Sequence, residues 1–204
     1  PRPEPPPRAA VPVEDPSFAS KALPKFLKTL GPPRPAPSIL DVAPVYGPNI
    51  SFFGQHLGCK LFVEDVYADV ERHLKAGRST QLAAFFETRF TQPDQSVDAV
   101  ICWDIIDYLD RPAAEALARQ LVRVLKRDGI LLGLFGTAAS QDAHYTRYIV
   151  VDETTLKYRP HPASRGRQAV LLNRDVIRLF PGLTVSDSFL LKNNVREILF
   201  RKTA

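Results

Sequence analysis

From residue 38 onward, short apolar runs alternate with segments whose apolar residues recur at helical spacing. The pattern predicts strands at 38–42, 60–64, 97–103, 130–135, 184–191 and 195–201, and helices at 49–57, 67–75, 112–126 and 174–180. Such alternation is typical of an α/β fold, a doubly wound and mostly parallel sheet with helices on both faces. Residues 79–90 fit either a helix or a strand.

The last two predicted strands differ from the rest because only two residues, Asn193 and Asn194, separate them. Such a pair favours the tight turn of an antiparallel hairpin. We therefore expect one antiparallel strand at an edge of the sheet.

The regions outside this pattern define the domain boundaries. Residues 1–16 contain seven prolines, which predicts a disordered tail with few contacts. Residues 17–37 should form an N-terminal helix, interrupted or restarted at Pro24, and a linker, with the helix over the sheet edge or the ligand cleft. The main domain is then 38–204. Its polar stretch 138–170 is predicted to be an insertion over the cleft, at the carboxyl edge of the sheet.

The composition narrows the class of protein. With 204 residues and 45% hydrophobic content, the chain can bury one core. No apolar run approaches the roughly 20 residues that span a bilayer, and the proline-rich N-terminus lacks the apolar segment of a secretory signal. The two cysteines and the four histidines show no metal-ligand spacing. We expect a cytoplasmic protein without a metal site or a membrane contact.

The net charge of +5 is concentrated in the last third of the chain, where residues 138–204 carry eleven basic and six acidic groups. Such a region favours an anionic substrate or a nucleic acid, or else is a solvated surface. The solvated surface is the simpler interpretation, because no Lys/Arg cluster with interleaved aromatic residues supports nucleic-acid binding. The oligomeric state stays open.

The loop after the first strand carries the first candidate binding residues. Residues 41–49 read DVAPVYGPN, in which a strand ends, a turn follows and a helix begins. In open α/β sheets this arrangement directs a backbone turn and a helix N-terminus at a nucleotide-like ligand.

This order of strands, helices and acids resembles the class I S-adenosylmethionine-dependent methyltransferases over residues 38–137 and 172–202. The resemblance implies a Rossmann-like, seven-stranded sheet in the order 3-2-1-4-5-7-6, and S-adenosylmethionine as cofactor. The family's loop reads D-x-G-x-G-x-G. Asp41 matches its acid and Gly47 its third glycine, whereas Ala43 and Val45 replace the first two. Val45 is the larger departure, because a glycine there lets the backbone approach the cofactor closely.

Further cofactor contacts follow from the same resemblance. Tyr46 and Asn49 could compensate for the missing glycines. The family's acid after the second strand binds the two ribose hydroxyls, and Glu64 and Asp65 are the candidates. We favour Asp65 slightly, and the other acid can cap the next helix.

Residues 96–109 (SVDAVICWDIIDYL) match the family most closely. Asp104 is expected at the carboxyl edge beside the methionine part of the cofactor, with Ile105 next to it. A general base is needed only if the acceptor is protonated. The candidates are Asp104, Asp107, Tyr108 and His144.

The favoured function is methyl transfer from S-adenosylmethionine to an unidentified acceptor, with a small molecule slightly favoured. The alternative is a catalytically inactive scaffold of this fold that binds protein or nucleic acid. The glycine-poor loop favours the scaffold, and the retained acids oppose it. A nucleotide-dependent oxidoreductase is a third hypothesis, weakened because the sequence has no G-x-G-x-x-G.

Overall fold

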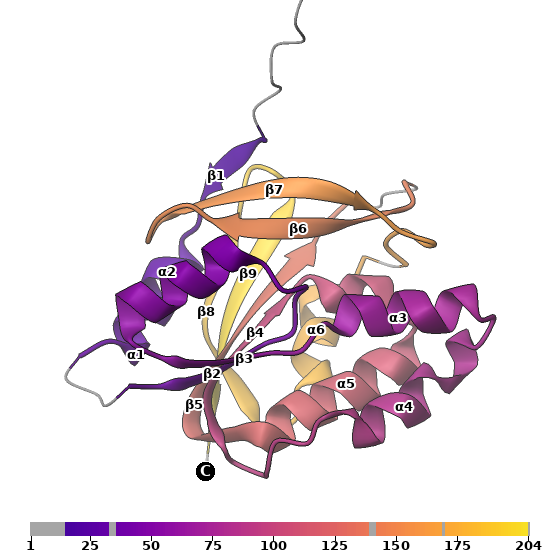
Figure 1. Cartoon of the computed structure of the whole chain (residues 1–204), viewed down its shortest axis with the longest axis horizontal. Coiled ribbons are helices and arrows are strands. Elements are labelled where there is room, and N and C mark those ends of the chain that lie inside the picture. The colour runs from indigo at the N-terminus through magenta and orange to yellow at the C-terminus, as the bar shows by residue number, and fades with distance from the viewer. Residues whose placement is uncertain (1–14, 33–35, 139–141, 169, 204) are drawn as a thin grey trace, which may run out of the picture.

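A computed structural model describes residues 15–32, 36–138, 142–168 and 170–203 (Figure 1). Its central sheet has six strands in the order β3-β2-β4-β5-β9-β8. They are β2 (Ser38–Asp41), β3 (Lys60–Val63), β4 (Val97–Trp103), β5 (Leu125–Gly136), β8 (Leu183–Leu190) and β9 (Val195–Lys202).

The strand directions agree with the sequence pattern. The strands β3, β2, β4 and β5 pair in parallel, while β9 pairs antiparallel with both β5 and β8. Asn194, in the turn before β9, has φ = 60°. The α/β class, the single antiparallel strand and the final hairpin are thus confirmed. The edge position predicted for the antiparallel strand is wrong, because β9 lies between β5 and β8 and the edge strand is β8.

The predicted count of seven strands is wrong, because the family's third strand is missing. Residues 79–90 form the short 3-10 helix η1 (Ser79–Gln81) and the helix α4 (Leu82–Arg89) instead. Leu82 and Phe86 are four residues apart and both buried, a spacing that places them on one face of a helix. β3 is therefore an edge strand, and the family's order is shortened to 2-1-4-5-7-6.

Helices cover both faces of the sheet (Figure 1). One hydrophobic core contains side chains of α3 (Val66–Lys75), α4, α5 (Arg111–Val124) and α6 (Asn173–Leu179). The other contains side chains of α1 (Ala22–Leu30) and α2 (Gly47–Leu57). The short 3-10 helix η2 (Ile105–Tyr108) follows β4 directly. The structure is thus a three-layer α/β/α arrangement.

The helix α1 corrects the expectation for the N-terminal segment. Pro24 is its third residue, in the first turn, where a missing N–H breaks no helical hydrogen bond, so the helix is not interrupted. Its apolar side packs on a face of the sheet, against β5 and β9, and not over an edge or a cleft. Buried Glu197 of β9 caps α1, because its Oε2 accepts from Lys21 N (2.8 Å) and Ala22 N (2.9 Å).

A second, smaller sheet has the order β1-β7-β6. It contains β1 (Ser17–Ala19) and the hairpin formed by β6 (His144–Val150) and β7 (Thr155–Pro162), all antiparallel. In Figure 1 this hairpin runs across one end of the central sheet. Its side chains reach Asp104 at the carboxyl end of β4, so part of the segment 138–170 lies over that edge.

The tail expected at 1–16 lies outside the described residues up to residue 14. Asp15 pairs with Arg159 at 2.6 Å, and the carbonyl of Pro16 accepts from Tyr158 N at 3.0 Å. These two residues therefore contact β7. No helix in the described part of the chain is long and apolar enough to cross a membrane.

Candidate active site

Asp41, the last residue of β2, is buried and bonded to the protein's own donors. Its Oδ1 accepts from Trp103 Nε1 at 2.7 Å and from Ala43 N at 3.0 Å. Burial raises the pKa of Asp41 to about 6. Asp41 thus joins the ends of β2 and β4 and fixes the start of the following loop.

The rest of this loop opens onto the start of α2. Val45 is 65% exposed, and the Arg147 guanidinium lies 5.7 Å from the centre of the Tyr46 ring. Gly47 begins α2, and no side chain caps the helix N-terminus. A Cβ added to Gly47 would meet no neighbouring atom within 4 Å, so there is space beside the N-terminus of α2.

Asn49 faces the hairpin. Its Nδ2 donates to Tyr148 O at 3.0 Å, and its Oδ1 accepts from Val150 N at 2.9 Å. The side chain is buried and binds β6 as a neighbouring strand would. Asn49 therefore fastens α2 to the hairpin.

The two acids after β3 have different partners. Glu64 accepts from Arg89 at 2.8 Å and from Gln92 at 2.7 Å, so each of its oxygens has a donor. Asp65 is the N-cap of α3, and its Oδ1 accepts from Ala68 N at 2.8 Å. The acid favoured for the ribose is thus also the helix cap.

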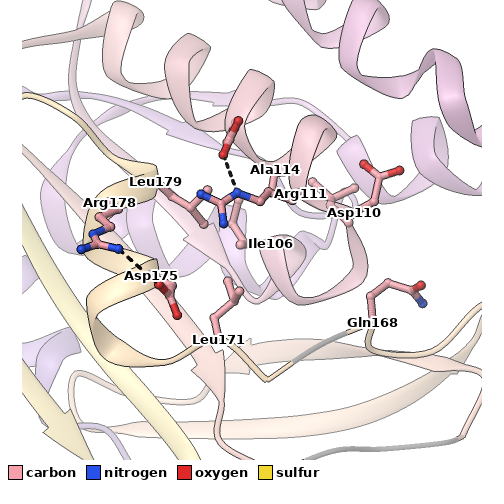
Figure 2. Close-up of a pocket in the computed structure, with 11 residues that line it drawn as sticks. Ile106, Asp110, Arg111, Ala114, Gln168, Leu171, Asp175, Arg178 and Leu179 are labelled. Carbon is pink, nitrogen blue, oxygen red and sulfur yellow. Dashed lines mark hydrogen bonds and ion pairs between the residues drawn. The ribbon is translucent and has the colours of Figure 1, made fainter.

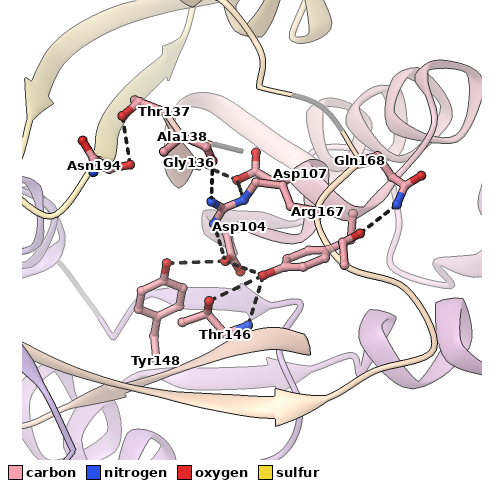
Figure 3. A network of polar contacts seen from close by, with 12 residues as sticks. Asp104, Asp107, Gly136, Thr137, Ala138, Thr146, Tyr148, Arg167, Gln168 and Asn194 are labelled. Atoms are coloured by element: carbon pink, nitrogen blue, oxygen red, sulfur yellow. Dashed lines mark hydrogen bonds and ion pairs between the residues drawn. The ribbon is translucent and has the colours of Figure 1, made fainter. Parts of the chain in front are cut away.

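Asp104 is fully buried and accepts hydrogen bonds from three tyrosine hydroxyls, of which Figure 3 labels that of Tyr148. It accepts from Tyr67 at 2.6 Å, from Tyr108 at 3.1 Å and from Tyr148 at 3.4 Å. Burial raises its pKa. Trp103, directly before it, has φ = 48°, a left-handed conformation that costs free energy in an aromatic residue and is concentrated at functional sites.

Asp107 lies beside Asp104, and both acids face the guanidinium of Arg167. Its Oδ2 accepts from Gly136 N at 2.7 Å and lies 3.0 Å from Arg167 Nε, while another guanidinium nitrogen is 3.8 Å from Asp104 (Figure 3). Burial, and next the charge of Asp104, raise the pKa of Asp107 to about 8. The protein thus gathers two buried acids and one guanidinium at the carboxyl edge.

The remaining candidates are spread around this network. Ile105 is buried in the core next to Asp104. His144 begins β6, and among the described residues it is not one of the groups that hydrogen-bond Asp104. His73 is buried against the Phe85 ring, with a centroid distance of 4.6 Å. Among the described residues, no group of His, Cys, Asp and Glu could hold a metal ion.

Several residues of the network were not expected from the sequence. Trp103, Tyr67 and Tyr148 had no assigned role, and Arg167 was one of several arginines in the insertion. Tyr67 is in α3 and Tyr148 is in the β6–β7 hairpin, so their proximity depends on the fold. Their position in the sequence was the available signal, since Trp103 is the last residue of β4 and Tyr67 comes soon after the end of β3.

A cavity of about 180 Å³ lies apart from this network, between η2, α5 and α6 (Figure 2). Its wall is largely apolar, with Ile106, Leu171 and Leu179. Arg111 pairs with Glu115 at its rim. It contains none of the candidate cofactor residues.

Comparison with known proteins agrees with this architecture. Residues 40–133 match the profile of a methyltransferase domain. No curated protein sequence matches the chain. The chain therefore has the Rossmann-like fold of the class I S-adenosylmethionine-dependent methyltransferases.

Similar solved structures include an S-adenosylmethionine-dependent methyltransferase from Mesorhizobium loti, with 12% identity, a TM-score of 0.55 and coverage of 88% of this chain and 95% of that one. The glycopeptide N-methyltransferase MtfA in complex with S-adenosylmethionine has 14% identity, a TM-score of 0.52 and coverage of 99% and 100%. The [4+2]-cyclase SpnF has 12% identity, a TM-score of 0.54 and coverage of 90% and 81%. At such identities the likeness concerns the fold alone.

Proposed function

We propose that the protein binds S-adenosylmethionine and transfers its methyl group to a small-molecule acceptor. The observation that carries this proposal is the meeting of three groups at one edge of the sheet. The uncapped start of α2 follows β2, Asp65 follows β3 and Asp104 follows β4. These three strands pair in parallel, so their carboxyl ends lie together, where open α/β sheets bind ligands.

The residues present fit parts of the cofactor. The N-terminus of α2, where Pro48 contributes no N–H and no side chain caps the helix, suits the carboxylate of the cofactor's methionine part. Asp65 would accept from the ribose hydroxyls, and Asp104 would place negative charge near the sulfonium. The cofactor supplies an activated methyl group, so the chain needs mainly to orient the reactants and exclude water. The hairpin supports the exclusion of water, because Tyr148 is one of the side chains that bury Asp104.

A proton acceptor is also at hand. Because its pKa is raised to about 8, Asp107 exchanges a proton near neutral pH. It lies in the same buried network as Asp104. Asp107 is therefore our candidate to take a proton from the acceptor, and Tyr108 orients the network through its bond to Asp104.

A second candidate function is a scaffold without catalysis, and one observation favours it. Asp41 already accepts a hydrogen bond from Trp103. Asp104 already accepts one from Tyr148 and faces Arg167 at the carboxyl edge. Cofactor binding must replace some of these contacts. The fold also serves other chemistry, since the similar structure SpnF is a [4+2]-cyclase.

Calorimetric titration with S-adenosylmethionine and S-adenosylhomocysteine tests the proposal. Asp65→Asn retains a capping oxygen but removes the charge, so we expect about 10- to 30-fold weaker binding. The matched control is Glu64→Gln at the same strand end, with affinity expected within about threefold. The converse result would assign the ribose to Glu64. If neither compound binds wild-type protein at millimolar concentration, the scaffold is the better account.

A further inference from the structure

A second cavity, of about 210 Å³, lies beside the acidic network. It is open to solvent on one side and is lined by β1, the β6–β7 hairpin, the turn between β8 and β9, and Arg167. An engineered apolar cavity of about 150 Å³ is enough to bind benzene. The cavity beside Arg167 therefore has room for one aromatic ring with a substituent.

Three aromatic side chains from three strands line this cavity. The Phe18 ring stands edge-on to Tyr148, with centroids 6.4 Å apart, and lies 6.1 Å from Tyr158. Tyr148 is fixed from behind, because it stacks on Trp103 at 5.5 Å with an interplanar angle of 6°. Such walls favour a flat aromatic ring.

The polar part of the wall carries positive charge and neutral polar groups. Arg167 is held in place by Asp107 and by packing on Gly136, where an added Cβ would overlap the guanidinium. Thr146, Asn193 and Asn194 also line the cavity, and their side chains can donate hydrogen bonds. Figure 3 shows Arg167 beside Asp104 and Asp107.

The charge balance around Arg167 favours an anion. The cation faces Asp104 and Asp107, and burial raises the pKa of both acids, to about 8 for Asp107. At neutral pH Asp107 is therefore largely protonated and contributes little negative charge beside the guanidinium. A cationic ligand would meet Arg167 directly and be repelled.

We propose that this cavity binds a small aromatic carboxylate, with its ring against Phe18 and Tyr158 and its carboxylate on Arg167. The site itself is independent of methyl transfer. If the proposed function holds, this molecule is the acceptor or the part of the acceptor that anchors it. Guanidinium–carboxylate pairing then supplies orientation, and the aromatic walls supply most of the contact area.

Titration of the wild-type protein with benzoate, without S-adenosylmethionine, tests the site. We expect a dissociation constant near a millimolar or below, with chemical-shift changes at Arg167 and Phe18. Benzylamine, which has the same ring and the opposite charge, should bind at least about tenfold more weakly. Absence of benzoate binding at 10 millimolar, or equal binding of benzylamine, would overturn the proposal.

Variants locate the binding. Arg167→Gln should weaken benzoate binding about tenfold or more. The matched control, Arg178→Gln, changes an arginine of the other cavity and should leave the affinity unchanged. Because Arg167→Gln could disturb the buried acids, Tyr158→Leu provides a second variant at the opposite wall. It should weaken benzoate binding about threefold or more, and unchanged binding by both cavity variants would exclude the site.

The two proposals fail separately. If benzoate binds and S-adenosylmethionine does not, the proposed carboxylate site is supported and the proposed methyl transfer is contradicted. If S-adenosylmethionine binds and benzoate does not, the acceptor belongs to another chemical class.

Discussion

Trp103 donates its indole N–H to buried Asp41 at 2.7 Å, across the ends of the neighbouring parallel strands β4 and β2. One oxygen of Asp41 accepts both this bond and the Ala43 N–H. The Asp41–Trp103 pair therefore sets the relative position of two strand ends at the candidate active site.

Replacing Trp103 tests this relationship. Trp103→Phe removes a donor from a buried carboxylate and part of the stack on Tyr148, so we expect a loss of about 2–4 kcal/mol in the free energy of unfolding. Asp41→Asn retains an oxygen that accepts both hydrogen bonds, and should cost about 1 kcal/mol or less. Urea unfolding of the two variants at pH 7 measures the difference. Equal losses would show that the hydrogen bond is unimportant.

The raised pKa of Asp107 predicts a dependence of stability on pH. Its pKa is about 8 in the folded protein, above the usual value of 3.8, so the folded state retains this proton as the pH rises. The contribution is fully present below about pH 4 and is lost as the pH rises through 8. Asp107→Asn, which stays neutral, should therefore gain stability relative to wild type from pH 5 to pH 8, by up to about 1.4 kcal/mol per pH unit.

Denaturant unfolding of Asp107→Asn and wild type at four pH values measures this difference. Arg167 and Asp104 face the same group, and their charges oppose one another in their effect on its pKa. A constant difference between the two proteins across the range would show that Asp107 titrates normally.

The two hydrogen bonds between Asn49 and β6 predict that Asn49 stabilises the hairpin locally. Asn49→Ala removes two hydrogen bonds and leaves Val150 N buried without its acceptor, which should cost about 2–3 kcal/mol. Amide hydrogen exchange at Val150 should accelerate. The control is Ser51→Ala on the exposed side of the same helix, which should change neither quantity by much. Unchanged exchange at Val150 in Asn49→Ala would mean that the hairpin is held by other contacts.

The sequence was sufficient for the elements whose pattern is local. The predicted strand 97–103 is the observed β4, and the helix ending before Gly58 is α2, where Gly58 has the left-handed φ of 58°. The prediction of the family's third strand was wrong. Leu82 and Phe86 are buried on one face of a helix, and the short apolar pattern of this segment did not distinguish a helix from a strand.

The site was less predictable for a different physical reason. Its acids could be found because each follows a strand. Their partners could not, because Tyr148 and Arg167 reach Asp104 through contacts between segments that are far apart in the chain. Such pairings depend on how an insertion folds back, and periodicity carries no information about that.

The buried cap between Glu197 and α1 gives a further prediction. Glu197→Ala leaves two helix N–H groups without an acceptor and should cost about 2–4 kcal/mol. Glu197→Gln retains an acceptor oxygen and should cost about 1 kcal/mol. Removing the exposed Lys25–Asp187 pair by Asp187→Ala should cost less than about 0.5 kcal/mol. Thermal unfolding of the three variants gives the order, and a loss for Asp187→Ala as large as that for Glu197→Ala would contradict it.

The same cap, together with the buried side of α1, means that the N-terminal segment is held to the rest of the protein without help from the peptide bonds of the linker. Leu23, Phe26 and Leu30 are in the core, and Glu197 binds the start of their helix. A chain cut between residues 31 and 37 should therefore yield two fragments that stay associated. Two fragments that are expressed separately should bind each other and regain the folded structure. The linker is therefore a suitable place to split the protein, and association of the fragments would report folding.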